Sequence, residues 1–169
     1  NLFKSMIKVG VIGHGYWGPN LVRNFMAAPG SSVIAVCDKR EERLTQLRKL
    51  YPTLAVYTEA SDLINDPGID AIVIATPVAS HFDLALSAMK AGKHVLVEKP
   101  LATNSEQARK LIDEADKRQL VLMVDHTFVY TDAVRKMREL ISTGALGEIY
   151  YYDAVRVNLG LFQHDVNVI

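Results

Sequence analysis

Residues 9–18 read Val9-Gly10-Val11-Ile12-Gly13-His14-Gly15-Tyr16-Trp17-Gly18, an apolar run that ends in a G-x-G-x-x-G turn. Gly13 permits a tight turn from strand to helix, and Gly15 lacks the Cβ that would keep a pyrophosphate away from the backbone. Gly18 lets the following helix pack close to the sheet. The helix N-terminus offers free N–H groups and the positive end of its dipole to phosphates. The pattern predicts a strand, a phosphate-binding turn and a helix in succession.

An acid stands where a dinucleotide site needs one. Asp38 follows Gly18 by 20 residues and ends the apolar run 33–37, where its carboxylate can accept hydrogen bonds from an adenosine ribose. We therefore predict a dinucleotide site, with a structural turn in another kind of α/β sheet as the alternative. Asp38 favours NAD(H) over NADP(H), although Lys39 and Arg40 are placed to pair with a 2′-phosphate.

The composition is that of a globular protein without bulk charge. Its 169 residues are 49% hydrophobic, and 19 basic residues balance 19 acidic ones, so charge gives no reason to expect nucleic acid as a partner. No apolar run approaches the roughly 20 residues of a membrane span. No Cys and His spacing fits a metal site, and the single Cys37 excludes an intramolecular disulfide framework. We expect a cytoplasmic protein without a metal or a membrane anchor.

Apolar runs alternate with helix-like stretches along residues 6–142. We expect strands near 7–12, 33–37, 55–57, 71–75, 94–97 and 121–124, and helices near 16–28, 40–50, 60–64, 79–91, 105–118 and 131–142. Near-continuous apolar runs suit strands that are buried on both faces. Strand–helix alternation with short links predicts a doubly wound parallel sheet of the α/β class.

The composition changes after Gly144. Residues 148–157 are rich in β-branched and aromatic side chains, and we expect them to form the first strand of a second domain that covers 126–169. A lone strand cannot bury its own face. The chain is therefore expected to be the N-terminal part of a longer protein or to pair with another chain, and residues beyond about 148 are expected to support a homo-oligomer.

Two further segments place reactive side chains at the carboxyl ends of strands, where ligands bind in open α/β sheets. One contains Thr76-Pro77 and the other Glu98-Lys99. Lys99 is the candidate catalytic residue because its ammonium can hydrogen-bond a substrate hydroxyl beside a nicotinamide. A plain surface lysine after a strand is the alternative.

Three histidines are candidates for contacts with ligands. His14 lies within the glycine turn, near the predicted cofactor. His81 follows the Thr76-Pro77 segment, and packing within the protein is as good an explanation for it as ligand contact. His126 follows the sixth predicted strand on the ligand edge and is the candidate substrate-binding residue.

The glycine turn, Thr76-Pro77 with His81, and Glu98-Lys99-Pro100 together resemble the Gfo/Idh/MocA family of nicotinamide-dependent oxidoreductases. The resemblance implies a Rossmann domain followed by an α/β domain with a large open mixed sheet. It also implies that Lys99 lies in the active site and that the peptide bond between Lys99 and Pro100 is cis. The expected contacts with an NAD cofactor are Gly13, His14, Gly15, Tyr16, Trp17, Gly18, Asp38, Lys39, Thr76, Pro77, His81, Glu98 and Lys99.

The later segments 125–128, 147–150 and 156–160 resemble a branch of that family that acts on sugars, including nucleotide-sugar 3-dehydrogenases. This resemblance implies hydride transfer between nicotinamide and a hydroxyl or ketone of a sugar or nucleotide sugar. In that branch a catalytic Asp and His come from the second domain and would follow Ile169, so this chain alone is expected to be inactive. A dinucleotide-binding module without catalysis is the alternative function.

Overall fold

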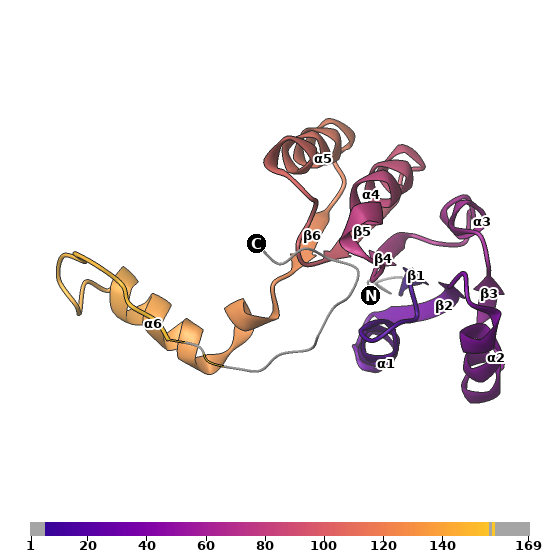
Figure 1. The fold of residues 1–169 in the computed structure, drawn as a ribbon, viewed down its shortest axis with the longest axis horizontal. Helices are drawn as coiled ribbons and strands as arrows, with labels where there is room; N and C mark the ends of the chain where they lie inside the picture. The colour runs from indigo at the N-terminus through magenta and orange to yellow at the C-terminus, as the bar shows by residue number, and fades with distance from the viewer. Residues whose placement is uncertain (1–5, 156, 158–169) are drawn as a thin grey trace, which may run out of the picture. The chain divides into compact units, whose positions relative to one another are not determined.

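The computed structural model describes residues 6–155 and residue 157 (Figure 1). The chain divides into two compact units, Asn1–His126 and Thr127–Ile169. Among the described residues, no helix is long and apolar enough to cross a membrane.

The first unit is built on a parallel sheet of six strands. They are β1 (Ile7–Ile12), β2 (Ser31–Cys37), β3 (Ala55–Tyr57), β4 (Ala71–Ile74), β5 (His94–Glu98) and β6 (Leu122–Asp125). Their order is β3-β2-β1-β4-β5-β6, and each neighbouring pair is parallel. This is the doubly wound Rossmann order, in which the direction of winding reverses between β1 and β4. The predicted fold class is confirmed.

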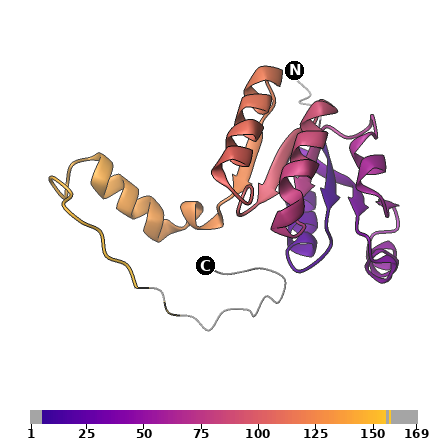
Figure 2. The ribbon, with the colours of Figure 1, turned by 45° about the horizontal axis from the view of Figure 1, so that its top comes forward.

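Helices cover both faces of this sheet (Figures 1 and 2). Their bounds are α1 (Gly18–Ala27), α2 (Glu41–Leu50), α3 (Ala60–Ile64), α4 (His81–Lys90) and α5 (Ser105–Arg118), and a 3-10 turn, Val78–Ser80, precedes α4. Side chains of α1 and α2 pack on one face, and those of α3, α4 and α5 pack on the other. A layer of helices on each face explains why the strands read as continuous apolar runs.

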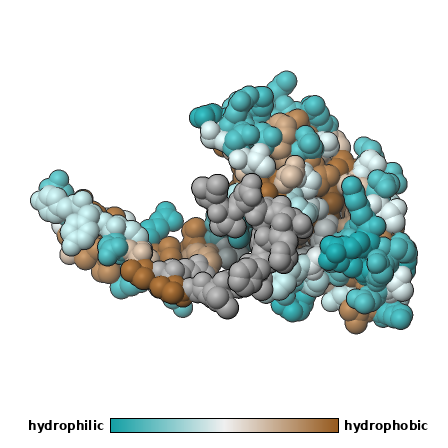
Figure 3. Space-filling model, in the orientation of Figure 1, coloured by the Kyte–Doolittle hydropathy of each residue, from teal (hydrophilic) through white to brown (hydrophobic). Residues whose placement is uncertain are grey.

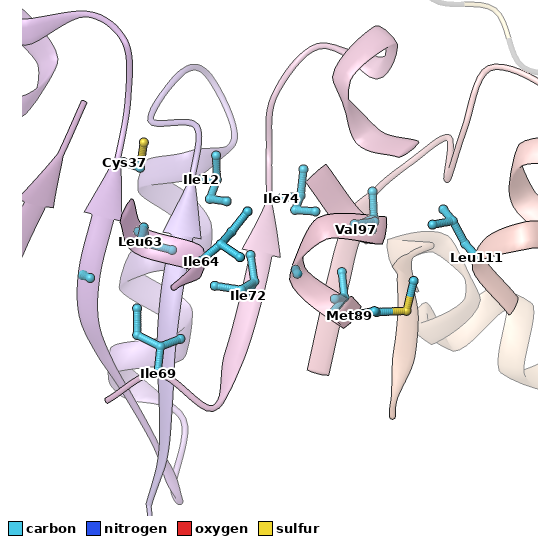
Figure 4. Close-up of a cluster of buried hydrophobic side chains, with 14 of the residues drawn as sticks. Ile12, Cys37, Leu63, Ile64, Ile69, Ile72, Ile74, Met89, Val97 and Leu111 are labelled. Atoms are coloured by element: carbon cyan, nitrogen blue, oxygen red, sulfur yellow. The ribbon is translucent and has the colours of Figure 1, made fainter. Parts of the chain in front are cut away.

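Successive strand residues point to opposite faces and so contribute to two separate cores. On the face of α3 to α5, Ile12, Ile74 and Val97 pack with Met89 and Leu111 (Figure 4). On the other face, the described strand residues in the core are Val9, Val11, Val33, Val36 and Val73. These two cores hold the strand ends in place, and the loops that follow the strands carry the candidate site.

The helix starts follow local chemistry. Asn104 is the N-cap of α5, and its side chain accepts a hydrogen bond of 2.9 Å from the Gln107 N–H. The helix expected from residue 16 begins at Gly18, because Tyr16 and Trp17 belong to the glycine turn.

The second unit corrects one expectation. It contains a 3-10 turn, Thr127–Tyr130, and α6 (Asp132–Ser142), but the described residues of the expected strand, 148–155 and 157, are neither helix nor strand. A strand needs a partner for its backbone groups, and none is paired with this stretch within the described part of the chain. The rest of the expected second domain lies outside the described residues.

The helix α6 has an apolar side without a buried residue. Met137 and Ile141 are 38% and 54% exposed, and hydrophobic residues are visible on the surface of this unit in the space-filling view (Figure 3). Together with Val134 and Tyr152, they line a shallow apolar hollow within the second unit. An apolar helix side of this kind is typical of a surface that another element or another chain covers.

Candidate cofactor and active site

The glycine turn packs backbone against backbone. Gly13 has a φ of +97°, and a Cβ there would lie 2.6 Å from the carbonyl oxygen of Ala75 in the loop after β4. A Cβ on Gly18 would collide with the carbonyl oxygen of Gly13. At Gly15, by contrast, only the flexible side chain of Arg43 is near, with its Nη1 at 3.3 Å from the position of a Cβ. Gly15 therefore presents an open backbone surface beside the N-terminus of α1, as a pyrophosphate site requires.

Asp38 is tied to this turn. Its Oδ2 accepts hydrogen bonds from the backbone N–H of His14 at 2.8 Å and from Arg43 Nη1 at 3.2 Å, and its Oδ1 accepts one from the Arg40 N–H at 2.9 Å. Burial acts to raise the pKa of Asp38, but these three hydrogen bonds hold it below its ordinary value. The carboxylate is therefore ionised, and with about four acceptor positions it keeps capacity for a ribose hydroxyl.

The expected cofactor contacts around the glycine turn lie in different environments. Lys39 is exposed, and so are Tyr16 at 69% and Trp17 at 46%, whose rings meet edge to face at 5.2 Å. His14 has a buried Nδ1 without a hydrogen-bond partner among the described residues, and burial lowers the pKa of its ring. Burial thus favours the uncharged form of the His14 ring, which borders the turn.

Arg43 was not found by sequence reasoning. It lies on the first turn of α2, bonds Asp38 and approaches Gly15. Its position in the sequence, within a charged helix start, is typical of a solvated residue. Only the packing of α2 against the turn brings its guanidinium to the site.

The Thr76-Pro77 segment lies beside the glycine turn, because the methyl carbon of Thr76 would lie 3.0 Å from a Cβ on Gly13. The Thr76 hydroxyl accepts a hydrogen bond of 2.7 Å from the Ser80 hydroxyl. These contacts place the loop after β4 at the point where the winding of the sheet reverses.

His81 faces the protein interior. It is 1% exposed, and its Nδ1 and Nε2 lie 2.8 Å and 2.7 Å from the carbonyl oxygens of Pro100 and Thr76. Both ring nitrogens are engaged, so the ring has no free polar atom for a cofactor. The geometry places His81 inside the protein, bonded to its own backbone, and not in contact with the surface expected to receive the cofactor.

The end of β5 places Lys99 beside a buried acid. Lys99 is exposed, its bond to Pro100 is cis as expected, and its backbone N–H donates to Glu98 Oε2 at 3.2 Å. Glu98 is 7% exposed and pairs in register with Asp125 at the end of β6. Burial first, and then the charge and hydrogen bond of Asp125, raise the pKa of Glu98 to about 7.

Asp125 is a second residue that sequence reasoning did not single out. Glu98 and Asp125 each occupy the last position of a strand, and that shared position is the signal that could have paired them. His126 follows Asp125 and is exposed on the same edge of the sheet. The ends of β5 and β6 thus gather Glu98, Lys99, Asp125 and His126, whereas the described residues contain no group of three or more His, Cys, Asp or Glu able to hold a metal ion.

The raised pKa of Glu98 predicts a pH-dependent stability. The native state keeps this proton up to a pKa of about 7, whereas the unfolded carboxyl releases it near 4.5, so the free energy of unfolding falls as the pH rises through this window. Between about pH 4.5 and 7.5, the free energy of unfolding of the Glu98→Gln variant should fall by about 1–3 kcal/mol less than that of the wild-type chain. Urea unfolding at a series of pH values measures the difference.

Two variants control this experiment. Glu106→Gln should leave the slope in place, because the hydrogen bond from Lys110 lowers the pKa of the exposed Glu106 and moves its titration below this window. Asp125→Asn should move the window to lower pH, because it removes a negative charge next to Glu98. A Glu98→Gln variant with the wild-type slope would show that another group is responsible.

Comparison with known proteins agrees with this site. Residues 7–126 match a family model described as the Gfo/Idh/MocA oxidoreductase family with an NAD-binding Rossmann fold. The chain belongs to this family. The expected cofactor, NAD, is confirmed by this membership, because an NAD-binding fold defines the family.

Relatives of this Gfo/Idh/MocA chain include the uncharacterized oxidoreductase YdgJ of Escherichia coli (strain K12), which is 37% identical over 148 residues, covering 88% of the chain and 42% of that protein. The dTDP-3,4-didehydro-2,6-dideoxy-alpha-D-glucose 3-reductase of Streptomyces violaceoruber is 35% identical over 126 residues, covering 74% of the chain and 36% of that enzyme. A crystal structure of a putative oxidoreductase from Klebsiella pneumoniae superposes with a TM-score of 0.75 at 31% identity, covering 85% of this chain and 41% of that one. The chain spans less than half the length of these relatives.

Proposed function

We propose that the protein carrying this chain is an NAD-dependent dehydrogenase that acts on a hydroxyl or ketone of a sugar or nucleotide sugar. The observation that carries the proposal is the arrangement of the ligand edge. The glycine turn with ionised Asp38 follows β1 and β2, and Lys99 with buried Glu98 follows β5 of the same sheet. The nucleotide-sugar reductase among the relatives supports the substrate class.

The residues present fit a dinucleotide. The open backbone at Gly15 and the N–H groups at the start of α1 would receive the pyrophosphate, and Asp38 would accept a hydrogen bond from the adenosine ribose. When bound, NAD supplies the acceptor for a hydride. Each of these contacts comes from a group whose position is set by backbone packing, so the site needs little rearrangement to receive its ligand.

Lys99 handles the proton in this proposal. When the substrate is oxidised, the hydride leaves its carbon with two electrons, and the step places the hydroxyl proton on Lys99 Nζ, which must be in its amine form to accept it. In the reverse direction, the Lys99 ammonium returns that proton to the ketone oxygen. His126, exposed at the end of β6, is proposed to contact the substrate from the same edge of the sheet.

A direct test measures binding and turnover separately. Calorimetric titration of the chain should show tighter binding of NAD⁺ than of NADP⁺, because Asp38 is ionised and repels a 2′-phosphate. The protein carrying the chain should form NADH with at least one member of a panel of sugars and nucleotide sugars. Tighter binding of NADP⁺ would refute the role of Asp38, and binding without turnover on any member would favour the alternative, a dinucleotide-binding module.

We also propose that residues 6–125 form the dinucleotide-binding domain of a cytoplasmic homo-oligomer, and that 126–169 begin a substrate and oligomerisation domain. Tyr150, Tyr151 and Tyr152 are 84%, 86% and 75% exposed, and no strand is paired with them among the described residues, which supports this proposal. Light scattering should report a dimer or larger species for the chain and a smaller one for a variant that ends at Gly144. A monomeric chain, or association that survives the truncation unchanged, would contradict it.

A further inference from the structure

His81 connects the two loops on which the proposed site depends. One carbonyl that it contacts belongs to Thr76, in the loop after β4, and the other belongs to Pro100, directly after Lys99. The two strands are neighbours, with Ile74 opposite Val97. The imidazole thus bridges the loop beside the glycine turn and the loop that carries the proposed reacting lysine.

The buried surroundings of His81 require hydrogen bonds for its two ring nitrogens. A polar group that is almost fully buried lowers stability unless its hydrogen bonds are made, and a leucine or phenylalanine could fill the same space without that requirement. Carbonyl oxygens only accept, so a ring nitrogen bonds the carbonyl that it faces only when it carries a hydrogen: Nδ1–H donates to Pro100 and Nε2–H donates to Thr76. Packing alone therefore does not account for a histidine here.

We propose that His81 is a positioning residue for Lys99. Its hydrogen bond to the Pro100 carbonyl sets the turn that carries Lys99, and its hydrogen bond to the Thr76 carbonyl ties that turn to the loop beside the glycine turn. Lys99 is itself exposed, so its backbone must be held if Nζ is to meet the substrate hydroxyl repeatedly in one place. This role rests on the proposed function, in which Lys99 takes the hydroxyl proton.

Asn and Gln variants can separate the two hydrogen bonds. The side-chain amide nitrogen of Asn lies close to the position of Nδ1, and that of Gln lies close to the position of Nε2. His81→Asn thus keeps a donor toward Pro100, His81→Gln keeps a donor toward Thr76, and His81→Phe fills the space with neither. His94→Gln, at the start of β5, is the matched control.

The kinetic result is a split between kcat and cofactor affinity. In the protein carrying the chain, His81→Phe should lower kcat by about 10²-fold, because a displacement of about 1 Å at the reacting group has an effect of that size. His81→Asn should keep most of the activity, His81→Gln should resemble His81→Phe, and the Kd for NAD⁺ should change by less than about threefold in all three. If kcat and NAD⁺ affinity fall by equal factors, the positioning role is overturned, and His81 instead supports cofactor binding.

A spectroscopic measurement on the chain itself tests the bridge without turnover. The backbone carbonyl ¹³C shifts of both Pro100 and Thr76 should move in His81→Phe, the Pro100 shift should be restored in His81→Asn, and the Thr76 shift in His81→Gln. Unchanged carbonyl shifts in His81→Phe would overturn the inference. A lower kcat in His81→Asn than in His81→Gln would also overturn it, and this comparison holds even if His81→Phe does not fold. If the three variants show these shift changes and the wild-type protein that carries the chain shows no turnover, the proposed function is refuted instead.

Discussion

Replacing Lys99 with Ala is expected to lower kcat by about 10²–10⁴-fold, the usual contribution of a positioned general acid or base. The Kd for NAD⁺ should change by less than about threefold, because the pyrophosphate and ribose contacts come from Gly15, α1 and Asp38. Steady-state kinetics and calorimetry on the protein that carries this chain give the two quantities.

Lys110→Ala is the matched control for this experiment. Lys110 is an exposed lysine on α5 that pairs with Glu106 at 2.8 Å, so its loss should leave both kcat and NAD⁺ affinity unchanged. If Lys99→Ala lowers NAD⁺ affinity as much as kcat, Lys99 is a binding residue and the proton-transfer role is wrong.

Alanine at two glycines of the turn is expected to give two different results. Gly18→Ala places a Cβ against the carbonyl oxygen of Gly13, so the turn must shift, and both the stability of the chain and its affinity for NAD⁺ should decrease. Gly15→Ala meets only the flexible Arg43 side chain at 3.3 Å, so the chain should fold with nearly unchanged stability. It should nevertheless bind NAD⁺ at least about tenfold more weakly, because the new methyl group occupies the surface that the pyrophosphate approaches.

Thermal unfolding and calorimetry on the two variants separate these effects. We expect the melting temperature of Gly18→Ala to fall by several degrees, since about 1 kcal/mol corresponds to roughly 2–4 °C in a domain of this size. Wild-type NAD⁺ affinity in Gly15→Ala would show that the pyrophosphate does not lie over the turn. A stable, NAD-binding Gly18→Ala variant would show that the close packing at Gly13 is not required.

The strand expected over residues 148–157 shows that local sequence pattern alone does not predict strand formation. Its β-branched and aromatic residues favour a strand, yet the described residues of this stretch adopt none. In the first unit, comparable runs became strands because each had a neighbour in register, as β1 has in both β2 and β4. Strand propensity describes a side chain's fit to a sheet, and the hydrogen bonds that form the sheet come from a partner.

Sequence reasoning missed two residues of the site, Arg43 and Asp125, for a related reason. The sequence pattern assigns Arg43 to a solvated helix, and at the end of β6 it draws attention to His126 rather than to the preceding Asp125. Arg43 reaches Asp38 because α2 packs beside the glycine turn, and Asp125 reaches Glu98 because β6 is the neighbour of β5. Neither contact can be inferred without the strand order.

The sequence by itself determined the alternation of strands and helices, the glycine turn with Asp38, and the segments that carry Thr76 and Lys99, because each depends on consecutive residues and their φ preferences, periodicity and charge. Only the tertiary structure decided that His81 lies at hydrogen-bond distance from Pro100, 19 residues away. It also decided that Glu98 lies opposite Asp125 on the neighbouring strand. Such contacts depend on which strands are neighbours, and strand order is set by the packing of the whole sheet between its two layers of helices.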